Sequence, residues 1–220
     1  SELIVEQLGV EKARAVATAG VEGADEEDGD EDVETLGADL TRFRGVAARC
    51  NYLSFDRPDS QYAMKEICRE MSKPTTGSLR RLRRIACYLR GNKRLVWTYN
   101  MQDESGVLDV YTDSDWAGCA TTAKSTSGGA VCIGEHVIKT FCRQQKVIAL
   151  SSAEAELYAM VEATTRAKGL LSLAWALGFK DLSNVVPKGT WKDASFGNQG
   201  LVASKGGGGW SAGGVQGVWY

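Results

Sequence analysis

Short segments in the second half of the chain alternate between apolar and polar residues. From about 107 to 113 this alternation has the two-residue period of a strand. The apolar runs 128–133 and 137–141 predict two more strands, which Gly134-Glu135 joins as a hairpin. The pattern therefore predicts three strands in this region, two of them paired as a hairpin.

A helical period follows. It predicts a long helix over about 151–177, with Ser151 or Ser152 as its N-cap and Gly178 as its stop. A further strand is predicted near 185–193. We expect the buried stripe of the helix to consist of Ala153, Leu157, Met160, Val161, Thr164, Leu171 and Trp175.

The order of these elements predicts an α/β (α+β) domain over 100–204, with a mixed sheet and one long helix. A small helical block is predicted before it, over 40–99. Its helices run over about 41–53, from after Pro58 to about 71, and from after Pro74 to Gly91.

The last of these helices pairs an apolar face with a basic one. A basic face can follow a phosphate backbone, or it can simply be the solvated side of an amphipathic helix. The residues alone leave both interpretations open. The candidate nucleic-acid-binding residues on and after this helix are Arg80, Arg81, Arg83, Arg84, Arg90, Lys93 and Arg94.

The net charge of −2 is small because the positive charge of this helix is offset by an acidic tract elsewhere in the chain. Dense acidic charge with few apolar residues predicts a disordered linker over 21–39. Residues 1–20 are expected to be a frayed strand-plus-helix remnant without a clear core partner, and the Gly-rich tail 205–220 to form no regular element.

Six cysteines without C-x-x-C spacing indicate free thiols in a reducing compartment. The sequence has no apolar run of membrane-spanning length and no signal peptide. It starts at Ser1, and we expect a fragment of a longer chain. These features predict an intracellular protein, cytoplasmic or nuclear, with no membrane association.

Three widely spaced acids are candidate ligands of Mg²⁺ or Mn²⁺, because such ions prefer hard carboxylate oxygens. Asp113 and Asp193 end predicted strands, and Glu156 lies in the first turns of the long helix. Periodicity alone does not choose between Glu154 and Glu156, and Asp115 shares a strand face with Asp113. No Asp, Glu or His follows Asp193.

Four motifs occur in order around these acids: 111–118 (YTDSDWAG), 124–129 (KSTSGG), 144–146 (QQK) and 149–159 (ALSSAEAELYA). Together they resemble the ribonuclease H domain of Ty1/copia-type retrotransposon Pol polyproteins. The upstream segments 43–53, 57–59, 71–75 and 82–91 are similar to the connection-like segment that follows the polymerase in these polyproteins. Residues 1–20 would then be a remnant of the polymerase's C-terminal region.

The resemblance implies a ribonuclease H-like fold and Mg²⁺-dependent endonucleolytic hydrolysis of RNA in an RNA/DNA hybrid. Asp113, Glu156 and Asp193 match the family's first three acids and are the implied catalytic and metal-binding residues. The implied partners are the hybrid and the polymerase part of the same polyprotein.

The family's histidine and fourth acid are missing: residues 205–214 stand at the corresponding positions and include no His, Asp or Glu. The only histidine, His136, lies in the predicted hairpin and is interpreted as a surface residue. We therefore expect an incomplete active site and an impaired reaction. The alternative is a catalytically inactive nucleic-acid-binding remnant of a Pol polyprotein; a third interpretation is an unrelated structural α/β domain.

Overall fold

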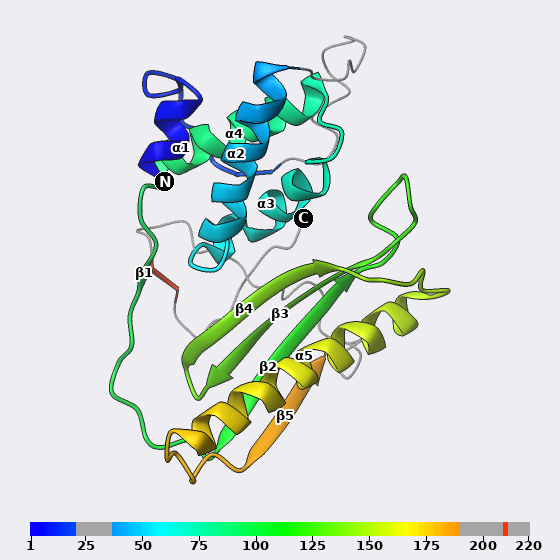
Figure 1. Ribbon diagram of the computed structural model, residues 1–220. Helices are drawn as coiled ribbons and strands as arrows, with labels where there is room; N and C mark the ends of the chain where they lie inside the picture. The colour runs from blue at the N-terminus through cyan, green and yellow to red at the C-terminus, as the bar shows by residue number, and fades with distance from the viewer. Residues whose placement is uncertain (21–36, 190–208, 211–220) are drawn as a thin grey trace. The chain divides into compact units, whose positions relative to one another are not determined.

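The structure is a computed structural model that describes residues 1–20, 37–189 and 209–210 (Figure 1). It divides into two compact units, Ser1–Leu95 and Val96–Trp219. Most of the predicted acidic linker and of the Gly-rich tail lies outside the described residues. None of the described helices is both long and apolar enough to cross a bilayer.

The first unit is helical. Its elements are α1 (Glu2–Gln7), α2 (Ala38–Leu53), the 3₁₀ turn η1 (Pro58–Ser60), α3 (Gln61–Arg69) and α4 (Thr76–Gly91). Helix α4 begins with a capping box, in which the Ser78 amide donates to the Thr75 hydroxyl at 3.2 Å and the Thr75 amide donates to the Ser78 hydroxyl at 2.9 Å. This exchange satisfies two backbone donors that the start of a helix leaves unpaired.

The N-terminal segment belongs to the core of this unit, contrary to the expectation of a remnant without a core partner. Ile4 and Val10 are buried in the same cluster as Phe43, Leu82 and Ile85. Arginines of the helices also hold this segment: Arg90 donates to the Glu11 carbonyl at 2.6 Å, and Arg42 donates to the Gln7 carbonyl. Local sequence patterns carry no signal for this packing, because the partners lie 30 or more residues away.

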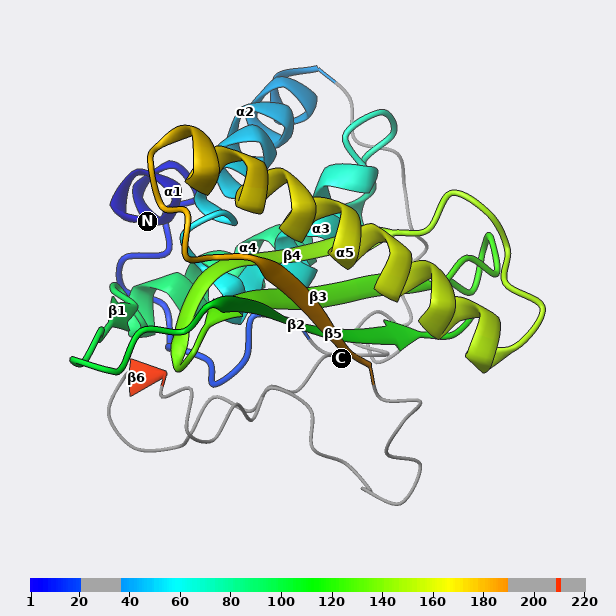
Figure 2. The ribbon, with the colours of Figure 1, turned by 90° about the horizontal axis from the view of Figure 1, so that it is seen from below.

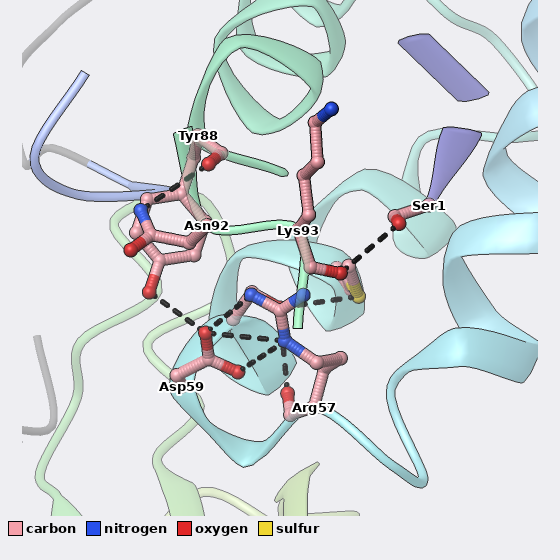
Figure 3. A network of polar contacts seen from close by, with 8 residues as sticks. Ser1, Arg57, Asp59, Tyr88, Asn92 and Lys93 are labelled. Atoms are coloured by element: carbon pink, nitrogen blue, oxygen red, sulfur yellow. Dashed lines mark hydrogen bonds and ion pairs between the residues drawn. The ribbon is translucent and has the colours of Figure 1, made fainter. Parts of the chain in front are cut away.

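A buried polar network stabilises the turn before α3 (Figure 3). Arg57 donates to both carboxylate oxygens of Asp59, at 2.9 and 2.7 Å, and the Tyr88 hydroxyl donates to Asp59 at 2.7 Å. Burial, followed by the charge of Asp59, raises the pKa of Tyr88. The network therefore joins the Arg57–Asp59 turn to α4 with every charged group paired.

The second unit is built on a four-stranded sheet with the order β4-β3-β2-β5. Its elements are β2 (Val107–Asp115), β3 (Thr126–Ile133), β4 (His136–Gln144), α5 (Ser152–Ala176) and β5 (Asn184–Gly189). Strands β2, β3 and β4 are antiparallel neighbours, whereas β5 runs parallel to β2. Helix α5 lies along one face of this sheet (Figure 2). The predicted mixed α/β fold is confirmed.

The buried stripe of α5 differs from the predicted one. The fully buried positions are Ala155, Ala159, Ala163 and Ala167, each one turn after the last. The predicted Leu157 and Val161 are instead 57% exposed each. Small side chains let the helix approach the sheet closely. The apolar pattern of the helix is dominated by its larger residues, such as Leu157 and Val161, and therefore does not indicate the alanine stripe.

Gln102 fixes the turn between β3 and β4, where Gly134 has a φ of 56°. Its side chain accepts from the Glu135 amide at 2.8 Å and donates to the Ile133 carbonyl at 2.9 Å. His136 is partly exposed, and its ring packs edge-on against Tyr99 with centroids 5.1 Å apart.

The two remaining strands are short. β1 (Val96–Trp97) and β6 (Gly209–Trp210) pair in parallel. The expectation of no regular element in the Gly-rich tail is thus wrong for these two residues. Backbone pairing needs no hydrophobic period, so the Gly-rich composition of the tail could not indicate strand β6.

Candidate active site

The two parallel strands of the second unit's sheet, β2 and β5, have their carboxyl ends near each other. The last β2–β5 pair is Thr112 with Gly189, and Asp113 follows directly on β2. The other neighbour, β3, continues to pair with β2 past this point, as far as Asp115. Asp113 is therefore the β2 residue next to this pair, near the carboxyl ends of both strands, where sheets of this kind present functional side chains.

Glu156 reaches this strand end from the first turns of α5. Its Oε1 accepts from the Ser114 amide at 3.1 Å and from the Ser114 hydroxyl at 2.9 Å. These contacts place the carboxylate beside the residue that follows Asp113. Positions 113 and 156 are thus brought together from two elements far apart in the sequence.

Burial raises the pKa of Asp113, and the charge of Asp115 acts in the same direction. Hydrogen bonds from the Ser114 backbone and from the Glu156 side chain act in the opposite direction. Two carboxyl groups in contact resist double ionisation unless a cation neutralises them. The pair thus has the chemistry of a cation site.

Glu154 has a different environment. Its carboxylate accepts from the Leu150 amide at 2.7 Å and from the Tyr158 hydroxyl at 2.8 Å, and these bonds lower its pKa. Its own amide donates to the N-cap residue Ser151 at 3.2 Å. Glu154 thus belongs to the cap of α5, and the structure places Glu156 beside Asp113 instead.

Asp115 begins a tight turn after β2. Its side chain lies so close to Gly118 that a Cβ at position 118 would overlap it. Ala117 has a φ of 55°, and its amide donates to the buried hydroxyl of Ser125 at 3.1 Å. The Trp116 indole donates to the Ala149 carbonyl at 3.1 Å. The turn is therefore tied to both the 124–129 and the 149–159 motifs.

Comparison with known proteins finds relatives among Pol polyproteins. Over 142 residues, 64% of this chain, it is 33% identical to the "Retrovirus-related Pol polyprotein from transposon RE1" of Arabidopsis thaliana. The corresponding RE2 polyprotein is 32% identical over 142 residues. These similarities support a protein derived from the Pol polyprotein of a copia-type retrotransposon.

This copia-type chain covers about a tenth of those two polyproteins (10% of each). It is also 31% identical over 122 residues to the "Uncharacterized mitochondrial protein AtMg00810" of Arabidopsis thaliana, which is 56% of this chain and 50% of that protein. No family model and no solved structure matches the chain.

The third predicted acid of the copia-type chain, Asp193, lies outside the described residues. Among the residues that the structure describes, no group of three or more His, Cys, Asp or Glu side chains is placed to hold a metal ion. Asp113 and Glu156 nevertheless offer adjacent carboxylate oxygens, the donor type that Mg²⁺ and Mn²⁺ prefer. The two described acids fit such an ion, and a third ligand has to come from elsewhere.

Three of the seven basic residues predicted to bind nucleic acid have partners within the helical unit. Arg81 pairs with Glu70 at 2.5 Å, Arg84 donates to the Thr18 hydroxyl at 3.2 Å, and Arg90 donates to the Glu11 carbonyl. By contrast, Arg83, Lys93 and Arg94 are exposed, and Arg80 is partly exposed. The predicted basic residues therefore divide into some that also bind within the unit and others that are exposed.

Sequence reasoning missed Ser114 and Gln145. Ser114 holds Glu156, and Gln145 is 5% exposed and bonded to both β3 and α5. A signal was present, since both lie within motifs of the copia-type pattern. Neither composition nor hydrophobic periodicity indicates a function for neutral polar side chains such as these. Their role is visible only from their contacts in the folded structure.

Proposed function

We propose that the second unit is a ribonuclease H-type hydrolase that cuts the RNA strand of an RNA/DNA hybrid. The observation that carries this proposal is the pair of carboxyls at the end of β2, Asp113 and Glu156, held together by Ser114. Similarity to copia-type Pol polyproteins and the mixed sheet with its long helix support it.

Asp193 is the proposed third acid. Strand β5 ends at Gly189 beside Thr112, and Asp193 follows four residues later in the sequence. Four residues of extended chain span up to about 14 Å. That length is enough for a carboxylate from this segment to reach the edge of the sheet where Asp113 lies.

Asp113, Glu156 and Asp193 would hold Mg²⁺ or Mn²⁺. When bound, such ions supply Lewis-acid stabilisation of the leaving oxygen and a hydroxide nucleophile at neutral pH. The contribution of the chain is orientation: Ser114 fixes Glu156, and the Glu156 side chain is hydrogen-bonded to Asp113, so the two carboxyls would lie side by side as cation ligands. Because the register of the family's fourth acid, 205–214, contains no carboxylate, we expect slower cleavage than in a four-acid site.

The proposed partners are the hybrid and the polymerase part of the same polyprotein. The exposed Arg83, Lys93 and Arg94 would contact phosphates through salt-dependent, sequence-independent attraction. The proposed location is intracellular, cytoplasmic or nuclear.

The test is incubation of the full chain with an end-labelled RNA/DNA hybrid in Mg²⁺ or in Mn²⁺, beside Asp113→Asn. We expect internal cleavage of the RNA strand by the parent chain and at least a hundredfold less by the variant. Equal cleavage by both proteins would point to a contaminating nuclease. Salt-sensitive hybrid binding without cleavage would instead support the inactive nucleic-acid-binding remnant.

A further inference from the structure

Gln145 is a buried polar residue with contacts on both sides of the helix–sheet interface. It follows β4 directly, and its backbone amide extends the β3–β4 ladder by donating to the Ser125 carbonyl at 2.8 Å. Its Nε2 donates to the Ser127 hydroxyl at 2.9 Å and to the Ala155 carbonyl at 2.8 Å. One amide group therefore joins β3 to the first turns of α5.

The orientation of this amide is dictated by its partners. The Ala155 carbonyl can only accept a hydrogen bond, so the nitrogen of Gln145 has to face it. Ala155 is fully buried, and Gln145 is 5% exposed. Water is thus largely kept from competing for the bond, and loss of the donor would leave a buried acceptor without it.

These contacts link Glu156 to the sheet by two routes. Ala155 immediately precedes Glu156, and Ser127 is the cross-strand neighbour of Ser114 in the β2–β3 ladder. Ser114 in turn holds the Glu156 carboxylate through its amide and hydroxyl. Glu156 is thus fixed at its carboxylate by Ser114 and at the preceding carbonyl by Gln145.

We propose that Gln145 is a positioning residue, which sets the place of Glu156 relative to Asp113 by tying the first turns of α5 to β3. The role in metal binding rests on the proposed hydrolase function, whereas the positioning itself does not. A purely structural role would make Gln145 equivalent to any other buried residue between α5 and the sheet.

The test compares Gln145→Met, which keeps the length but removes the donors, with Val131→Ala in the full chain. Val131 is fully buried on β3 in the cluster that also contains Ala163 and Ala167 of α5. The first readout is the hydrogen-exchange rate of the Ser114 amide by NMR. We expect Gln145→Met to raise it about tenfold relative to the other β2 amides, and Val131→Ala to raise no single amide selectively.

The second readout is the Mg²⁺ concentration at half-maximal hybrid cleavage. We expect it to rise about tenfold in Gln145→Met with the KM for the hybrid unchanged, and to stay constant in Val131→Ala. Unchanged Ser114 exchange in Gln145→Met, or the same change in both variants, would overturn the positioning role. Altered Ser114 exchange in a chain that never cleaves would keep that role and reject the hydrolase.

If Gln145→Met does not fold, Gln145→Asn replaces it. Asparagine keeps the amide but is one methylene shorter, so it cannot span from Ser127 to Ala155. The same selective rise in Ser114 exchange is expected, and its absence in a folded Gln145→Asn overturns the proposal.

Discussion

The Glu156 carboxylate accepts both the amide and the hydroxyl of Ser114, at 3.1 and 2.9 Å. A serine directly after Asp113 thus orients the acid on the facing helix. The Ser114 backbone and the Glu156 side chain also hydrogen-bond to Asp113, whereas the Ser114 hydroxyl bonds to Glu156, so the hydroxyl can be removed while the backbone contact to Asp113 is kept.

Ser114→Ala should therefore weaken cleavage while leaving the fold intact. It removes the hydroxyl bond but keeps the amide bond, and one net hydrogen bond of about 1 kcal/mol corresponds to roughly a fivefold to tenfold loss of kcat/KM. The measurement is steady-state cleavage of a labelled hybrid. Ser172→Ala is the matched control, because the Ser172 hydroxyl bonds only to the Lys168 carbonyl within α5. Equal losses in both variants would contradict the role of Ser114.

The raised pKa of Asp113 predicts the pH dependence of stability. The folded state binds this proton more tightly than the unfolded chain does, so the contribution of Asp113 is fully present below its ordinary pKa of 3.8. It is lost as the pH rises from there through the raised folded-state value. Asp113→Asn removes this loss, and its free energy of unfolding should exceed that of the parent at pH 7 in the absence of divalent cations.

Urea unfolding of both proteins from pH 4 to pH 8 measures this difference. Mg²⁺ should raise the stability of the parent at pH 7 and leave Asp113→Asn almost unchanged, because the cation offsets the charge that the variant lacks. A parent that is as stable as the variant across this range, with or without Mg²⁺, would show that the burial of Asp113 has no energetic consequence.

Periodicity predicted β2 because its alternate residues are buried on the face toward α5 and partly exposed on the other. Leu108 and Val110 are buried in the core beneath α5, and their alternation with Asp109 and Tyr111 carries that signal. The same reasoning failed for α5. Its buried stripe consists of alanines, whose small side chains carry little hydrophobic signal beside Leu157 and Val161.

The candidate site could be predicted only in part, for a related reason. The sequence shows which acids exist, but Glu154 and Glu156 lie in the first turns of the same helix. Only their contacts in the folded structure distinguish their roles. Glu154 meets Leu150 and Tyr158, its neighbours in sequence, whereas Glu156 meets Ser114, which is 42 positions away. Local periodicity carries no information about such distant pairs.

The alanine stripe makes a prediction of its own. Ala159→Leu should destabilise the second unit by about 1–3 kcal/mol, because a larger side chain would force α5 away from the sheet. Leu157→Ala, two positions earlier on the exposed side, should change stability by less than about 0.5 kcal/mol. Thermal unfolding followed through amide exchange in β2 and β3 reports this unit. The reverse order of effects would restore the stripe that the sequence predicts.

The buried network of the helical unit is tested by Tyr88→Phe. This variant keeps the ring but removes the hydroxyl that donates to Asp59 at 2.7 Å, a bond to a charged acceptor worth about 1.5–3 kcal/mol. Asp59 keeps both bonds from Arg57, so the unit should fold with a lower urea midpoint and an unchanged m-value. Tyr52→Phe is the control, since Tyr52 is largely exposed on the same unit. Identical midpoints for the two variants would mean that the Tyr88 hydroxyl does not stabilise the turn before α3.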